Sequence, residues 1–148
     1  MKKILYIIAA AAALLLSASC QKDSDRLVSK LAADWHYTAK ENGVAEDVWV
    51  SFFEDGSFEM FQKAGDGPYW YTQGEYELDT EKNILSGVYS DRYPWKYSYK
   101  VSVSDRTLEM EAVELKGYIL KYNKETVPAD VREKSLPLTK SESAELFL

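Results

Sequence analysis

The fold is indicated most clearly by the segment Trp95-Lys96-Tyr97-Ser98-Tyr99-Lys100-Val101-Ser102-Val103-Ser104. Every odd-numbered residue in it is apolar or aromatic, and every even-numbered residue is Lys or Ser. Successive side chains of a β-strand point to opposite faces, so this alternation predicts a strand with one buried face and one face in water. Half-buried strands of this kind are typical of antiparallel sheets.

The next segment, Leu108-Glu109-Met110-Glu111-Ala112, continues the alternation in a matching phase. A two-residue turn at Asp105-Arg106 would join the two strands as a hairpin. Residues that face each other would then be both apolar or of opposite charge, which supports this register. The three predicted pairs are Val103 with Leu108, Val101 with Met110, and Lys100 with Glu111.

A second hairpin is predicted around Glu54-Asp55-Gly56, with strands at 48–53 and 57–62. Gly56 suits the left-handed conformation that a three-residue hairpin loop requires. The predicted pairs are Phe52 with Phe58 and Val50 with Met60 facing inward, and Trp49 with Phe61 on the outer face.

Four further strands bring the predicted number to eight, all joined by short loops. These four strands are predicted at 35–40, 69–78, 84–89 and 117–124. Loops this short exclude the crossover connection that parallel strands need. Closing an eight-stranded meander removes its two edges. The expected fold is therefore all-β, an eight-stranded antiparallel up-and-down barrel.

Short helices are expected to flank the barrel at both ends. Residues 24–31 form an amphipathic segment, and Pro128 suits the first turn of a helix at 127–134. The chain after the signal segment is long enough for one domain with its own core. We expect this domain to span residues 27–135 and a C-terminal tail to span 136–148.

The first nineteen residues have the organisation of an export signal. Met1-Lys2-Lys3 is cationic, residues 4–16 are apolar, and Ser17-Ala18-Ser19 is a run of small residues. The apolar run is too short for a helix that crosses about 30 Å of hydrocarbon. Residues 1–19 are therefore predicted to be a cleaved signal peptide.

The stretch Leu14-Leu15-Leu16-Ser17-Ala18-Ser19-Cys20 resembles a lipobox, the motif cut by the lipoprotein signal peptidase. The resemblance implies that Cys20 becomes the lipidated first residue and that residues 20–26 form an anchor and linker. Its acyl chains would hold the protein in the cell envelope, at the outer membrane. Residues 21–25 also resemble the short acidic export tether of surface lipoproteins, although any anchored domain needs a polar linker. The alternative is an exported soluble protein with a free thiol.

The charge of the chain argues against two classes of partner. The 148 residues include 18 basic and 24 acidic side chains, for a formal net charge of −6. Removing residues 1–19 takes away two lysines and brings the net charge near −8. Proteins that bind nucleic acid or lie on anionic lipid carry basic clusters, and this chain has none. Cys20 is the only cysteine, so no intrachain disulfide is expected.

The sequence predicts no catalytic or metal site. His36 is the only histidine, and we expect it on the surface of a strand between two aromatic neighbours. One imidazole and a lipidated cysteine cannot form a Ser-His-Asp, Cys-His or His/Cys zinc arrangement. Glu75 with Glu77, and Glu109 with Glu111, alternate with inward residues and should face water rather than flank a glycosidic bond. We therefore expect no enzyme activity and no cofactor.

The organisation resembles the lipocalin-like domains of bacterial lipoproteins over roughly residues 27–135. A short helix leads to Ala33-Asp34-Trp35, where lipocalins have Gly-x-Trp. Two further elements match, Phe52-x-x-Asp55-Gly56-x-Phe58 and Gly74-x-Tyr76-x-Leu78. The resemblance implies a barrel that binds a small, often hydrophobic ligand inside or at its mouth. It also implies that Trp35 is buried at the closed end beside a helix at 27–33.

A candidate ligand site follows from the topology. Alternate loops of an up-and-down barrel share an end, so the aromatic loops 64–68 and 90–94 should meet opposite the N-terminal helix. Rings give flat apolar contact, and an arginine there can hold a polar or anionic group. We expect a small hydrophobic or amphiphilic molecule, or a glycan, to bind there. The predicted contact residues are Tyr69, Trp70, Arg92, Tyr93 and Trp95.

The alternative is that aromatic rings fill the barrel, since an eight-stranded interior is just wide enough for side chains or one small ligand. The rings that alternate inward are Trp70, Tyr76, Trp95, Tyr97, Tyr99, Tyr118 and Tyr122. A filled barrel would favour a structural or interaction module, such as an accessory subunit, an adhesion protein or an inhibitor. Such a module would use its outer surface, where we expect Trp49 and Phe61 to be exposed.

Overall fold

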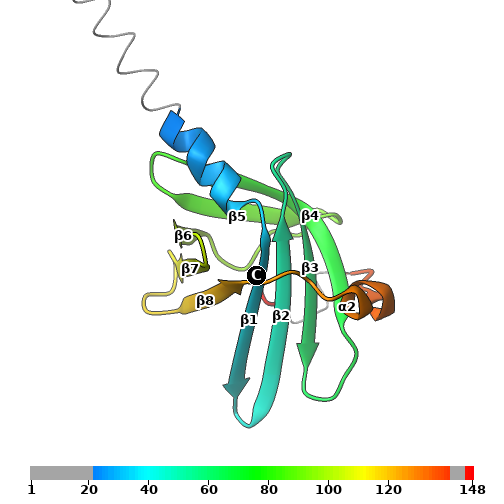
Figure 1. Ribbon diagram of the computed structural model, residues 1–148. Coiled ribbons are helices and arrows are strands. Elements are labelled where there is room, and N and C mark those ends of the chain that lie inside the picture. The colour runs from blue at the N-terminus through cyan, green and yellow to red at the C-terminus, as the bar shows by residue number, and fades with distance from the viewer. Residues whose placement is uncertain (1–21, 141–145) are drawn as a thin grey trace, which may run out of the picture.

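Figure 1 shows the computed structural model, which describes residues 22–140 and 146–148. The predicted signal peptide and Cys20 lie outside the described residues. Eight antiparallel strands follow one another around a closed barrel, and β8 pairs back with β1. The strands are β1 (Asp34–Glu41), β2 (Val44–Phe52), β3 (Ser57–Ala64), β4 (Trp70–Asp79), β5 (Ile84–Tyr89), β6 (Tyr99–Val103), β7 (Thr107–Ala112) and β8 (Ile119–Lys124).

Within the residues that the structure describes, two helices and one short strand complete the fold. The N-terminal helix covers residues 22–31, so it takes in part of the predicted linker. Helix α2 (Ala129–Lys134) starts after Pro128, as predicted. Strand β9 (Leu136–Pro137) runs parallel to the start of β4. Neither described helix has the length and apolar character needed to cross a bilayer.

Both predicted hairpin registers are confirmed. Val103 faces Leu108, and Lys100 faces Glu111, across β6 and β7. Phe52 faces Phe58 across β2 and β3. Gly56, in the loop between β2 and β3, has a φ of +86°, in the left-handed region that glycine adopts without strain.

Two predicted strands are shorter in the structure: β8 begins at Ile119 rather than at 117, and β6 is shortened more. Strand β6 begins at Tyr99, whereas the alternation predicts a strand from Trp95. The backbone N–H of Ser98 donates to the carboxylate of Glu114, at 3.0 Å and 3.2 Å to its two oxygens, instead of to a neighbouring strand. The indole of Trp95 packs directly over Gly87, where an added Cβ would lie 2.5 Å from the ring. These contacts hold 95–98 as an irregular segment.

The interior of the barrel is filled by one contiguous cluster of side chains. Trp35 is fully buried, and its indole N–H donates to the main-chain oxygen of Leu31 in the N-terminal helix at 2.9 Å. The helix therefore closes this end of the barrel, as predicted. Of the rings predicted to point inward, four are buried: Tyr76, Trp95, Tyr99 and Tyr122. Tyr97 and Tyr118 are half-buried against the cluster, and Trp70 is 39% exposed.

The prediction that Trp49 and Phe61 are exposed is wrong. They lie on the outer face of β2 and β3, but are only 6% and 3% exposed. The chain after β8 crosses this face, and Val127 and Val131 cover the two rings (Figure 1). We call these four residues the outer core. The sheet at β2 and β3 is thus buried on both faces.

One cation fastens α2 to the sheet. Arg132 pairs with Glu59 at 2.6 Å, and it donates to the hydroxyl of Ser51 at 3.0 Å. Its guanidinium lies 5.4 Å from the centroid of the Phe61 ring. A planar guanidinium suits this combination of a carboxylate, a hydroxyl and an aromatic face.

Candidate functional site

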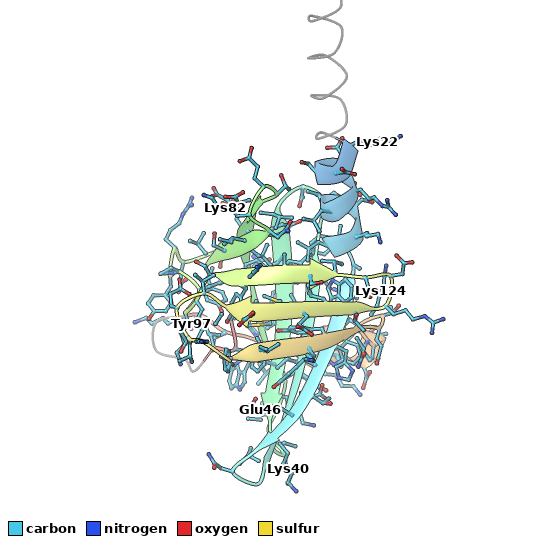
Figure 2. The ribbon with its side chains drawn as sticks, turned by 90° about the vertical axis from the view of Figure 1, so that its left-hand side faces the viewer. Lys22, Lys40, Glu46, Lys82, Tyr97 and Lys124 are labelled. Atoms are coloured by element: carbon cyan, nitrogen blue, oxygen red, sulfur yellow. The ribbon has the colours of Figure 1, made fainter. Side chains whose placement is uncertain are left out.

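The two ends of the barrel differ. The N-terminal helix covers one end, and the tight loops 53–56, 80–83 and 104–106 lie beside it. Figure 2 shows Lys22 and Lys82 at this end, whereas Lys40 and Glu46 lie at the far tip of the β1–β2 hairpin. The connections on the opposite side, which we call the open end, include the long segments 65–69, 90–98 and 113–118.

A groove of about 730 Å³ runs along the open end, and we call it the open-end groove. Its walls come from β2, β3 and β4, from the three long connections of this end and from residues near the C-terminus. Rings and aliphatic side chains line it together with polar groups, which include two lysines and Glu46. The residues used below are Gln62, Lys63, Trp70, Lys96, Tyr97, Leu115, Tyr118, Leu138, Leu146 and Phe147.

Leu146 and Phe147 line this groove, and Leu148 follows them into the interior cluster of the barrel. Leu148 is buried, with 1% of its surface exposed, and its main-chain oxygen accepts hydrogen bonds from the Tyr89 hydroxyl at 2.9 Å and the Lys96 N–H at 3.3 Å. The N–H of Phe147 donates to the side-chain oxygen of Gln62 at 3.1 Å. The sequence left open whether this end of the chain packs on the barrel. The structure shows that it enters the mouth.

The five predicted contact residues do not converge on one place. Trp70 lines the open-end groove. Tyr69 points to the outer face, where its hydroxyl donates to Asp47 at 2.6 Å. Burial, together with the hydrogen bond and negative charge of Asp47, raises the pKa of Tyr69 to about 12. Trp95 lies inside the barrel with its ring centroid 5.1 Å from that of Phe58.

Arg92 and Tyr93 lie away from the groove because the chain turns sharply after β5. The N–H of Arg92 donates to the oxygen of Tyr89, and the N–H of Tyr89 donates to the oxygen of Tyr93, both at 2.8 Å. Arg92 takes the left-handed conformation in this turn, with a φ of +70°. Its side chain is 83% exposed, borders a separate groove of about 350 Å³ and lies 4.0 Å from Glu75. The predicted grouping of Arg92 and Tyr93 with Trp70 is therefore corrected.

His36 has a defined environment on the outer face of β1. Its Nε2 lies 2.8 Å from Asp47, and its Nδ1 lies 3.1 Å from Glu125. The ring stacks flat on Trp49, with centroids 3.7 Å apart and planes 6° apart. The predicted surface position is thus half-buried, and the ring helps to join the chain after β8 to β1 and β2. Within residues 22–140 and 146–148, no three His, Cys, Asp or Glu side chains are arranged to hold a metal ion.

Sequence reasoning missed several residues of the groove. Lys96, Tyr97 and Tyr118 were expected in a strand or in the barrel interior, and they line the groove instead. The apolar run Leu146-Phe147-Leu148 could have indicated that this segment packs on the barrel. It follows a polar stretch, and burying its side chains removes apolar surface from water. Its position could not be predicted, because no periodicity connects it to Gln62 or Tyr89.

Comparisons with known proteins support the fold. No protein-family model matches the chain, and no curated protein matches it. The chain is similar to the NMR structure of a protein from Bacteroides uniformis ATCC 8492, with 10% identity and a TM-score of 0.56. The similarity covers 68% of this chain and 93% of that chain. At this identity the likeness shows a shared barrel fold.

Proposed function

We propose that the protein binds a small amphiphile in the open-end groove. The groove itself is the observation that carries this proposal, since it combines about 730 Å³ of space with aromatic and aliphatic walls. Ligand sites are concave and mostly apolar, with a few polar groups that fix orientation. Trp70 is 39% exposed and Leu115 is 44% exposed at the groove, so a ligand would bury apolar surface there.

The charge of the groove selects the class of amphiphile. Lys63 and Lys96 line it with a single carboxylate, that of Glu46, in a protein whose overall charge is negative. An acidic head group would meet these ammonium groups while its apolar body lies against Trp70 and Tyr118. We propose fatty-acid-like or bile-acid-like molecules over neutral glycans for this reason.

The location belongs to the same proposal. A lipid on Cys20 would hold the barrel at the outer membrane, where amphiphiles are plentiful. The organisation of residues 1–20 supports this part, together with the lipobox-like sequence. We propose no catalytic role. The imidazole of His36 does lie beside the carboxylate of Asp47, but this pair joins neighbouring strands.

Tryptophan fluorescence tests the binding. The purified protein is titrated with fatty acids, bile-type amphiphiles and oligosaccharides. Trp70→Ala should weaken binding of an acidic amphiphile about tenfold. A tenfold loss is about 1.4 kcal/mol, which corresponds to roughly 50–60 Å² of lost apolar contact with the ligand. Tyr93→Ala serves as the matched control, since Tyr93 is also exposed but lies outside the groove. No binding at millimolar concentration, or equal losses in both variants, would contradict the proposal.

A second candidate function is an interaction module that docks a protein partner at the open end. The filled interior favours this candidate, because no described part of the barrel offers the large enclosed pocket of a carrier. Val44, Trp70 and Leu115 are each at least 39% exposed around the open end. Two results together would favour the interaction module over amphiphile binding. No small molecule would bind, and Trp70→Ala would abolish capture of a protein from the same envelope.

A further inference from the structure

Residues 146–148 occupy the barrel mouth in the manner of a bound ligand. The side chain of Leu148 belongs to the interior cluster, and the ring of Phe147 lies 4.8 Å from that of Tyr37. The Leu148 main-chain oxygen is held by two donors of the barrel, the Tyr89 hydroxyl and the Lys96 N–H. An apolar body below a hydrogen-bonded oxygen is also the pattern of a carboxylate or carbonyl compound in a pocket.

The barrel offers more donors at this depth than residues 146–148 use. The hydroxyls of Tyr99 and Tyr122 are buried and have no hydrogen-bond partner among the described residues. Burial raises the pKa of the Tyr122 hydroxyl, and the neighbouring phenols of Tyr99 and Tyr118 raise it further. The Tyr122 ring lies 5.5 Å from that of Tyr37, the same ring that contacts Phe147, so Tyr122 is close to the segment 146–148. Buried hydroxyls are nearly always paired, and two unpaired ones beside a filled mouth call for an explanation.

We propose that residues 146–148 are an internal, displaceable occupant of a second site, deeper than the open-end groove, which takes an apolar carboxylate. The oxygens of the ligand would replace the Leu148 oxygen at Tyr89 and the Lys96 N–H. A carboxylate has about four acceptor positions, so it could also pair with the hydroxyls of Tyr99 and Tyr122. Its alkyl chain would take the place of the Leu148 and Phe147 side chains.

The position of residues 146–148 makes the displacement direct. Leu146 and Phe147 line the open-end groove, so their departure would extend that groove into the barrel. Three hydrogen bonds to described partners hold the segment, two at Leu148 and one at Phe147. The rest of the contact is apolar and can be reproduced by a ligand. This inference rests on the proposed function, because the ligand would enter through the groove.

The test compares the intact protein with a variant that lacks residues 146–148. Binding of dodecanoate and of the tripeptide Leu-Phe-Leu is measured by calorimetry. An internal competitor lowers apparent affinity by the fraction of time that the site is free, so truncation should tighten dodecanoate binding about tenfold or more. The tripeptide should bind the truncated protein and not the intact one. Equal dodecanoate affinity for both proteins would overturn the inference, while loss of binding in Trp70→Ala would still support the groove.

Full-length variants keep the test decisive if the truncated protein does not fold. Leu148→Asp should expel the segment and tighten dodecanoate binding, whereas Leu136→Asp, at an exposed leucine of β9, should not. Tyr122→Phe removes an unpartnered hydroxyl, so a purely structural role predicts unchanged affinity. We expect instead about tenfold weaker dodecanoate binding in the Leu148→Asp background, as for a lost hydrogen bond to a charged group. Unchanged affinity in that double variant would overturn the assignment of the site to a carboxylate.

Discussion

Truncation of Trp35 is the sharpest test of how the barrel is closed. The side chain is fully buried, and its indole N–H donates to the Leu31 oxygen at 2.9 Å. A buried tryptophan removes about 150–250 Å² from water, which at about 25 cal/mol per Å² gives roughly 4–6 kcal/mol as an upper bound. Measured losses for such truncations are about 3–5 kcal/mol. We expect Trp35→Ala to fall in that range.

The assay is urea unfolding of the purified protein, followed by circular dichroism. Trp35→Phe keeps a ring but leaves the Leu31 oxygen without its donor, so it should cost about 1–3 kcal/mol. Trp70→Ala is the matched control, since Trp70 is 39% exposed and its loss should cost below about 1 kcal/mol. A loss below about 1 kcal/mol for Trp35→Ala would show that the N-terminal helix does not seal the barrel on this ring.

Three further predictions concern Gly74 in β4, stability at alkaline pH and the lipid anchor at Cys20. A Cβ at Gly74 would lie 2.1 Å from the main-chain oxygen of Val88, so Gly74→Ala should lower the free energy of unfolding, measured in urea, by about 2–3 kcal/mol. Gly67→Ala should change it by no more than about 0.5 kcal/mol. The raised pKa of Tyr69, about 12, means that the folded state keeps a proton that the unfolded chain loses near pH 10. This contribution to stability is complete below pH 10 and is lost between about pH 10 and pH 12, so Tyr69→Phe should flatten the alkaline fall in unfolding midpoint; an unchanged pH profile would contradict this. Cys20→Ser should release the protein from the membrane fraction, and a variant that stays membrane-bound after carbonate washing would rule out the lipid anchor.

The hairpins were predictable because their information is local. Alternation and a turn residue specify both partners, as for Val103 with Leu108 across Asp105-Arg106. Trp49 and Phe61 were misplaced because their cover comes from Val127 and Val131, more than sixty residues later. Alternation shows that the outer face of β2 and β3 carries apolar side chains. It does not show which distant segment covers them.

The five predicted contact residues are not all brought together, for a related reason. Topology correctly brings the segments 65–69 and 90–98 to one end, but the direction of each side chain depends on backbone details. A left-handed residue at Arg92 turns that loop outward, and the hydrogen bonds of Ser98 to Glu114 shift the start of β6. These conformations could not be predicted from the residue types of Arg92 and Ser98. Arginine, for example, rarely has a positive φ.

The arrangement of the strands also bears on how a ligand could reach the interior. β1 and β2 are joined along their whole length, at eight residue pairs from Asp34 with Ser51 to Glu41 with Val44. The seam between β1 and β8 has only two pairs, Trp35 with Lys124 and His36 with Asn123. Opening this seam would still expose the fully buried Trp35, which packs against the helix. Moving residues 146–148 exposes one buried leucine and two half-buried side chains instead, so the mouth is the less costly route into the barrel.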